Sequence, residues 1–239
     1  MENKVVNHSF SGKYEKIAEQ YEAFHNKAEA DVDVAAYLNR TEGHKFLDEP
    51  KWIKAKTPFT AWSGNILAES KNGLIIGNHS SFDRVQYPGN EGKAGMSMIH
   101  ILGIPKENLF NGVSLNRNNV EIIDEMIHCF QQNWELPEFR SKILAHQKEA
   151  IERAKDLDEK NQKTYLKAKV HCQELERCID ELKVDDFTFG LHLWPDHSVG
   201  HLHMHIIATP YWCRQHSTFL HDDKTKDALE VRDFILSRQ

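Results

Sequence analysis

The spacing of apolar residues along this chain alternates between helical and extended patterns. Apolar residues three or four positions apart predict four amphipathic helices: 12–30, 31–45, 119–133 and 225–238. Short apolar runs predict four strands: 59–68, 73–77, 97–105 and 187–193. Asn72-Gly73 follows the first strand and predicts a hairpin turn, because this pair readily adopts a left-handed backbone.

The stretch 137–184 stands apart because it contains no glycine, no proline after Pro137, and many lysines and glutamates. Two amphipathic patterns run through it, and they predict either an αα-hairpin with a turn at 156–163 or one long helix. Its charged residues predict a solvated face. A docking or dimer-forming role for this stretch stays open.

Histidines occupy every second position near residue 203. His201, His203 and His205 alternate with apolar residues, which predicts a half-buried strand with all three imidazoles on one face. Their Cα atoms are expected about 6.6 Å apart, close enough for the rings to share one phosphate. Three interpretations fit this row: a metal site, attack on phosphorus by a neutral imidazole, or an exposed strand without chemistry.

The residues around this row favour the second interpretation. His-Leu-His-Met-His-Ile-Ile at 201–207 matches the signature His-φ-His-φ-His-φ-φ, in which φ is apolar, and Gly-Leu-His-Leu-Trp-Pro precedes it at 190–195. Gly-Leu-Ile-Ile-Gly-Asn-His-Ser at 73–80 and His-Ile-Leu-Gly-Ile-Pro-Lys at 100–106 look like two further strands of the same family. The chain thus resembles the histidine triad superfamily, in its Hint/aprataxin-like branch.

The resemblance covers residues 58–135 and 186–210, and it implies an α+β fold with an antiparallel β-sheet packed by helices. A histidine triad domain is then expected at 58–239, with 137–184 as a helical insertion. Residues 1–57 are expected to form an N-terminal helical extension. We interpret that extension as a cap on the sheet, with a partner-binding helix as the alternative.

The resemblance also implies a reaction. In the family the middle histidine attacks the α-phosphorus of a nucleotide derivative, so His203 is expected to form a nucleotidyl-histidine intermediate. The carbonyl of His201 would fix its tautomer, and His205 would contact the phosphoryl oxygens and help to protonate the leaving group. His100 would support the triad, and Ser198 would hydrogen-bond the leaving group. Activity is expected to fall at acidic pH as the imidazole protonates, near its reference pKa of roughly 6.5.

The implied substrates are adenosine 5′-phosphoramidates or aminoacyl-adenylates, which release AMP or GMP without a cofactor or a metal. Nucleotide contacts are implied for a second set of residues: Asn78, Ile76, His79, Trp62, His197, Val199 and Lys106. Asn78 stands where most Hint proteins have aspartate, so it keeps a carbonyl acceptor for the ribose but loses a charge. Ile76 and Trp62 would pack the base, with a plain core position as the alternative.

The composition of the chain limits the kinds of binding partner that are expected. The net charge of −6 disfavours nucleic acid, and with it an aprataxin-like deadenylase of nucleic-acid ends. Four scattered cysteines and the lack of a leader or a long apolar run predict a cytoplasmic or nuclear protein that does not span a membrane. Cys213, His216 and His221 form an incomplete zinc-ligand set, since a fourth ligand is missing.

Other functions stay open beside the phosphoramidate hydrolase. They are a dinucleoside polyphosphate hydrolase, a metal hydrolase, and a nucleotide-binding scaffold without physiological turnover. The expected partner is a small-molecule nucleotide, and a homodimer is compatible with the sequence.

Overall fold

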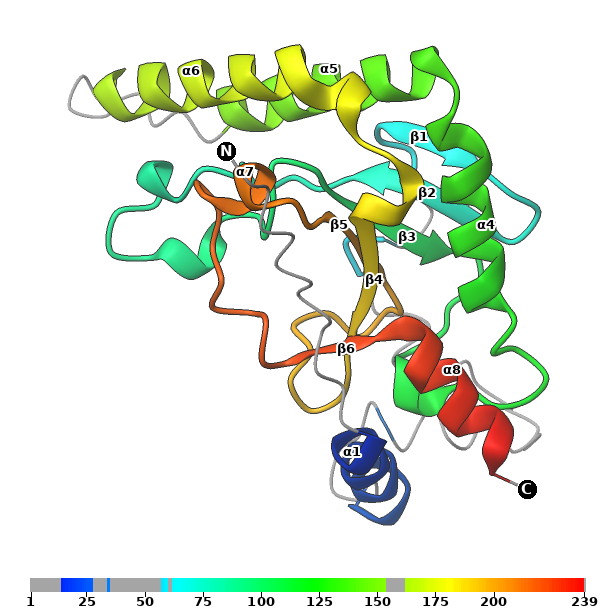
Figure 1. Cartoon of the computed structure of the whole chain (residues 1–239). Helices are drawn as coiled ribbons and strands as arrows, with labels where there is room; N and C mark the ends of the chain where they lie inside the picture. Colours follow the sequence, from blue (N-terminus) through cyan, green and yellow to red (C-terminus); the bar gives the residue numbers. More distant parts are fainter. Residues whose placement is uncertain (1–13, 28–33, 35–56, 60–61, 154–161, 239) are drawn as a thin grey trace.

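The computed structural model describes residues 14–27, 34, 57–59, 62–153 and 162–238. At its centre lies one six-stranded antiparallel sheet in the order β1-β2-β3-β5-β4-β6 (Figure 1). The strands are β1 (Ile66–Glu69), β2 (Gly73–Gly77), β3 (His100–Pro105), β4 (Phe187–His192), β5 (Met204–Ala208) and β6 (Thr225–Asp227). Helices pack on this sheet, so the predicted α+β class is confirmed.

The strands predicted at 73–77 and 187–193 are confirmed by β2 and β4. The strand predicted at 59–68 is wrong in its first half, because β1 begins only at Ile66. The side chains of Phe59 and Trp62 pack onto an apolar cluster of the sheet instead. These two side chains are therefore apolar because they pack against the sheet, and not because they belong to one of its strands.

Two further strands begin later than predicted, and the sequence does not predict β6. β3 begins at His100 and not at Ser97, whose hydroxyl donates to the backbone carbonyl of Ala208 at the end of β5 (2.7 Å). β5 begins at Met204, after the first two triad histidines, because the amide of Leu202 donates to the carbonyl of Leu109 (2.6 Å). β6 is only Thr-Lys-Asp and has no apolar alternation, so its pairing with β4 defines it.

The described helices are α1 (Tyr14–Lys27), α4 (Ile122–Trp134), α5 (Pro137–Arg153), α6 (Gln162–Cys178), α7 (Tyr211–Arg214) and α8 (Ala228–Ser237). Helices α1, α4 and α8 overlap their predicted ranges. Helices α5 and α6 confirm an αα-hairpin instead of one long helix. The helix predicted at 31–45, the turn predicted at 156–163 and most of the extension predicted at 1–57 fall largely outside the described residues.

The two faces of the sheet carry different side chains. The antiparallel register places His205 opposite Leu102 and Gly190, so these three positions share one face. Their neighbours in β5, Met204 and Ile206, point to the opposite face because side chains alternate along a strand. We call these the histidine face and the apolar face.

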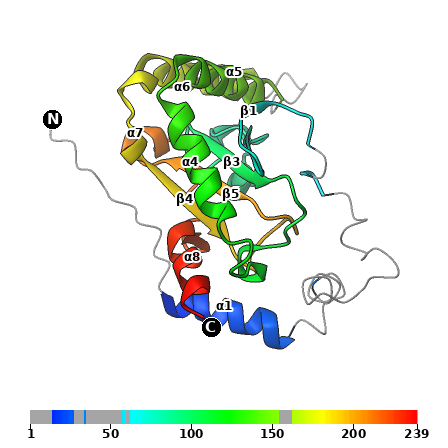
Figure 2. The same ribbon diagram turned by 90° about the vertical axis from the view of Figure 1, so that its right-hand side faces the viewer.

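The apolar face carries the main hydrophobic core. Helix α4 lies in front of the sheet, with α8 and α1 packed together below it (Figure 2). Buried side chains of α4, α8, β4 and β5 fill the space between these layers: Ile123, Met126, Phe130, Phe187, Leu191, Met204, Ile206, Val231 and Phe234. The apolar stripes of α4 and α8 therefore face the sheet, as their helical spacing predicts.

The α5–α6 hairpin lies across one end of the sheet (Figure 1). Helix α5 approaches β2 so closely at Gly77 that a Cβ atom there would collide with the ring of His146. The His146 ring also donates from Nε2 to the carbonyl of Asn78 (2.7 Å). Helix α6 contacts the segment after β2 through His171, which bonds the buried carboxylate of Asp83 (2.5 Å). Among the described helices, none is long and apolar enough to cross a membrane.

Candidate active site

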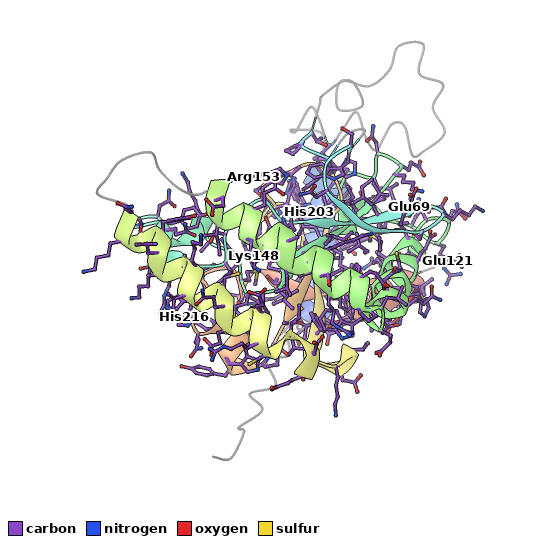
Figure 3. The ribbon with its side chains drawn as sticks, turned by 90° about the horizontal axis from the view of Figure 1, so that it is seen from above. Glu69, Glu121, Lys148, Arg153, His203 and His216 are labelled. Carbon is purple, nitrogen blue, oxygen red and sulfur yellow. The ribbon has the colours of Figure 1, made fainter. Side chains whose placement is uncertain are left out.

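His203 lies just before β5 with one ring nitrogen engaged and the other open. Its Nδ1 donates to the backbone carbonyl of His201 (2.8 Å), the contact that the family resemblance implies. This hydrogen bond places the proton on Nδ1 and leaves a lone pair on Nε2. Nε2 makes no hydrogen bond with any described residue. Figure 3 looks down on the hairpin, with His203 labelled beneath it.

A second set of hydrogen bonds fixes the tautomer of His205. The backbone amide of Met96 donates to Nδ1 of His100 (3.0 Å), so His100 carries its proton on Nε2. That Nε2–H donates to Nδ1 of His205 (2.8 Å). His205 must then carry its own proton on Nε2, which is buried and has no partner among the described residues. The chain of bonds therefore supplies a donor beside His203, whose ring centroid lies 5.0 Å away.

Burial keeps these rings uncharged. The triad histidines are fully buried, at 2, 8 and 7% exposure in chain order, so the half-buried strand predicted from their spacing is wrong. Burial is the largest cause that lowers the pKa of His203 to about 4 and that of His100 to about 3. It also holds the pKa of His205 well below its ordinary value. The acid limb expected near pH 6.5 therefore moves to about pH 4.

Both ring nitrogens of His201, the first triad histidine, are held by hydrogen bonds. The His201 ring donates from Nε2 to the carbonyl of Pro105 (3.2 Å), and its Nδ1 accepts from the hydroxyl of Thr57 (3.3 Å). The ring of Phe59 lies 5.8 Å from that of His201 and 5.2 Å from that of His203. Both rings are thus covered by the segment before β1, which explains their burial.

His192 joins the triad on the histidine face. The register that places Gly190 opposite His205 puts His192 on the same face, and the two imidazole centroids are 4.1 Å apart. Its Nε2 donates to the hydroxyl of Thr225 (3.0 Å), which itself donates to the carbonyl of His221. Burial lowers the pKa of His192 to about 2. We call His100, His192, His201, His203 and His205 the histidine cluster.

Some of the predicted nucleotide contacts lie beside this cluster. The amide of Asn78 donates to the His100 ring (3.2 Å), so its side chain faces the cluster. The rings of Trp62 and His79 are 5.3 Å apart, and Arg153 of α5 donates to His79 (2.9 Å). Ile76 is completely buried in the apolar cluster under Phe59 and Trp62, so in this structure it occupies a core position.

Other predicted contacts are not gathered at the cluster. The ammonium of Lys106 bonds Glu69 (2.6 Å) and two carbonyls of the β1–β2 turn. Ser198 is exposed in the turn that precedes the triad, and its hydroxyl bonds no described residue. Val199 and His197 are half-buried in the same turn, where His197 contacts the ring of Phe110 edge-on (5.3 Å).

The sequence patterns did not indicate two residues of this region, Phe59 and Arg153, and they left the face of His192 undecided. Phe59 and Arg153 come from segments that the histidine pattern does not touch. His192 could have been found from the alternation of β4, but only once the register against β5 is known.

The incomplete zinc-ligand set is dispersed. Cys213 is buried in the core, and burial raises the pKa of its thiol strongly. The ring of His216 stacks on that of His171 (3.5 Å between centroids), and His221 donates to the carbonyl of Gly92 (2.7 Å). Within the described residues, no three His, Cys, Asp or Glu side chains are grouped as metal ligands.

Comparison with known families agrees with this geometry. A family model described as "Scavenger mRNA decapping enzyme C-term binding" matches residues 137–218, less than half of the chain. That family has a histidine triad-like fold. The six-stranded antiparallel sheet and helices of this chain are consistent with the same fold. The match supports a nucleotide-binding hydrolase of the histidine triad superfamily, and it includes the hairpin that the sequence suggested as an insertion. No curated protein and no solved structure matches significantly.

Proposed function

We propose that this protein is a nucleotide hydrolase in which Nε2 of His203 attacks the α-phosphorus of a nucleotide derivative. The observation that carries the proposal is the 2.8 Å hydrogen bond from His203 Nδ1 to the His201 carbonyl. It directs the lone pair of Nε2 away from the backbone, and a pKa of about 4 keeps that lone pair free at neutral pH. A neutral imidazole with one nitrogen fixed by an acceptor is the form that can act as a nucleophile.

The reaction has two steps. In the first, a bond forms between Nε2 of His203 and the α-phosphorus, the bond to the leaving group breaks, and the leaving group takes up a proton. His205 donates from Nε2 to a phosphoryl oxygen or to the leaving group, because its other nitrogen accepts from His100. In the second step, water attacks phosphorus and loses a proton, which balances the proton that the leaving group took up. The bond to His203 breaks with its electron pair returning to Nε2, and the nucleoside monophosphate leaves.

Two substrate classes follow from different observations. The residues at 190–207 resemble Hint-like enzymes, which favours a P–N or acyl-phosphate bond in adenosine 5′-phosphoramidates or aminoacyl-adenylates. The matched family description names an mRNA decapping enzyme, and a cap is a nucleoside joined through a polyphosphate. That favours the second candidate, hydrolysis of a dinucleoside polyphosphate. For the first class, Ser198 would hydrogen-bond the amine that leaves.

The experiment is intact-protein and peptide mass spectrometry after a short incubation with an AMP phosphoramidate or with a diadenosine polyphosphate. We expect an AMP adduct on the peptide that contains His203 with at least one substrate, and none in His203→Ala. The ratio of kcat/KM for the two substrates assigns the class. Binding without an adduct and without turnover would overturn the hydrolase and leave a nucleotide-binding scaffold.

A further inference from the structure

The proton of His205 depends on a hydrogen-bond donor that lies outside the histidine cluster. His205 carries its proton on Nε2 only while His100 donates to its Nδ1 (2.8 Å). His100 gives that bond only while its own Nδ1 is unprotonated. The amide of Met96 donates to this nitrogen (3.0 Å), and a backbone N–H is a donor alone. The tautomers of both imidazoles therefore depend on the position of one peptide group.

Asn78 offers the same nitrogen a second donor, but it does not fix the tautomer. Its side-chain amide lies 3.2 Å from Nδ1 of His100. A side-chain amide has an oxygen beside its nitrogen, so a half-turn about its last bond would let it accept from a protonated Nδ1. The Met96 amide has no such alternative. The choice of tautomer thus falls to Met96.

The peptide of Met96 is anchored by a buried arginine. Met96 lies in the irregular segment shortly before β3, outside the strand ladder. Its carbonyl accepts from Nε of Arg214, the last residue of α7 (2.7 Å). Arg214 is only 1% exposed, and a hydrogen bond from a guanidinium is stronger than one between neutral groups. Arg214 therefore determines where the peptide of Met96 lies.

The guanidinium of Arg214 is itself held by residues of the following loop. Nη2 donates to the carboxylate of Asp222 (2.7 Å), whose side chain is 26% exposed. The ring of Phe219 lies against the guanidinium, with 4.6 Å between Cζ and the ring centroid. The ion pair and the contact with Met96 thus use different nitrogen atoms of Arg214, so they can be removed separately.

We propose that Arg214 is a positioning residue for the reaction at His203, because it holds the Met96 amide against His100 and so keeps the proton of His205 on Nε2. Without this anchor, His100 would be free to carry its proton on Nδ1 and to accept at Nε2. His205 would then donate from Nδ1 and present a lone pair, and not a proton, to the phosphoryl oxygen. This inference rests on the proposed function.

The test reads the tautomer of His205 by nuclear magnetic resonance of the full chain, with nitrogen-15 in its histidines. A ring nitrogen that carries a proton resonates far from one that does not, so each ring reports its own tautomer. The signals of His205 are identified by their loss in His205→Gln. We expect the proton on Nε2 in the wild-type protein. A wild-type His205 with its proton on Nδ1 would overturn the proposal, whether or not any variant folds.

Two variants separate the two contacts of Arg214. Arg214→Lys keeps a charge within reach of Asp222 but replaces Nε by a methylene group, so the Met96 carbonyl loses its donor. Asp222→Asn removes the ion pair and leaves Nε on Met96. We expect Arg214→Lys to move the proton of His205 to Nδ1 and to lower kcat about tenfold, the scale of one lost hydrogen bond, with KM within about twofold. Asp222→Asn should keep the wild-type tautomer and a kcat within about twofold.

Thermal unfolding shows whether each variant is folded. An unchanged His205 tautomer in a folded Arg214→Lys protein would overturn the proposal. So would an Asp222→Asn protein that shifts the tautomer as much, because Arg214 would then act only through its ion pair. The adduct experiment keeps the two proposals separate. A tautomer that depends on Arg214 without an adduct on His203 would support the positioning and reject the hydrolase, whereas an adduct with a tautomer independent of Arg214 would reject the positioning alone.

Discussion

The two faces of the sheet are built from the same strands, yet they are stabilised in different ways. On the apolar face, Met204 and Ile206 pack against helices and are completely buried. On the histidine face, His203 and His205 are also buried, but hydrogen bonds hold them in single tautomers. One face therefore supplies apolar burial, and the other supplies fixed donors and acceptors.

The difference shows that, along one strand, residues that stabilise the fold can alternate with residues that are placed for chemistry. Because side chains alternate, adjacent residues of β5 serve the two purposes with one peptide bond between them. A register shift of one residue would exchange the faces and place Met204 on the face that His203, the proposed nucleophile, occupies. The pairing of β5 with β3 and β4 excludes that shift.

The largest expected effect comes from substituting these two neighbours separately. His203→Ala should lower turnover by at least about 10³-fold, the scale for a lost covalent nucleophile. It should lower the free energy of unfolding by only about 1 kcal/mol, the value of one hydrogen bond. Met204→Ala should do the opposite and cost about 2–5 kcal/mol of stability, because it opens a cavity in the core. Urea unfolding and turnover measured on both variants check this.

If the His203→Ala protein kept most of its activity, the histidine face would not carry the chemistry, and the comparison between the two faces would be wrong. The comparison would also be wrong if the Met204→Ala protein stayed folded in the urea experiment but lost as much activity as His203→Ala.

The next expected effect is acid instability to which the histidine face contributes. The pKa of each cluster histidine is lowered in the folded protein, to about 4 for His203, so below about pH 6.5 the unfolded chain binds more protons than the folded one. Stability should therefore fall as pH drops from about 6.5 towards 4, by up to about 1.4 kcal/mol per pH unit for each such histidine.

Urea unfolding at several pH values measures this slope. His192→Gln removes one buried imidazole and should flatten the slope by about one proton. His128→Gln, at an exposed position of α4, is the matched control substitution. Activity of the folded enzyme should keep its acid limb near pH 4. An acid limb near pH 6.5 would show that the nucleophile is not buried during the reaction.

The smallest expected effect concerns the exposed turn that leads to the histidine face. Ser198 is exposed, so Ser198→Ala should leave stability unchanged. It should slow a P–N substrate by roughly 10- to 100-fold, because an amine leaves poorly without a hydrogen bond. A substrate with a good leaving group should react at nearly the normal rate. Equal slowing on both substrates would take the leaving-group role away from Ser198.

Much of the apolar face could be predicted from sequence, because its signals are local. The periodicity of α4 and the compact apolar run of β2 each specify their own element. Two amphipathic patterns also predicted the helical character of α5 and α6, but they left one long helix open beside the hairpin. β6 could not be predicted, since three residues without alternation become a strand only by pairing with β4.

The parts of the site that could be predicted are contacts between residues close together in the sequence. The bond from His203 to the His201 carbonyl lies within a two-residue span, and the family signature implies it. The pKa of about 4 did not follow, because it depends on burial by Phe59 from a distant segment. Lys106 shows the converse, since its place after a family-like strand suggested a nucleotide contact while its ammonium bonds the β1–β2 turn.

The close approach of α5 to β2 has a consequence for how this protein can evolve. The ring of His146 occupies the space where a side chain at Gly77 would begin. A Gly77→Ala change made first would displace the His146 ring and break its bond to the carbonyl of Asn78. A smaller residue at 146 made first would leave room for the second change. Of the two mutational orders that lead to the same pair of substitutions, only one avoids this collision.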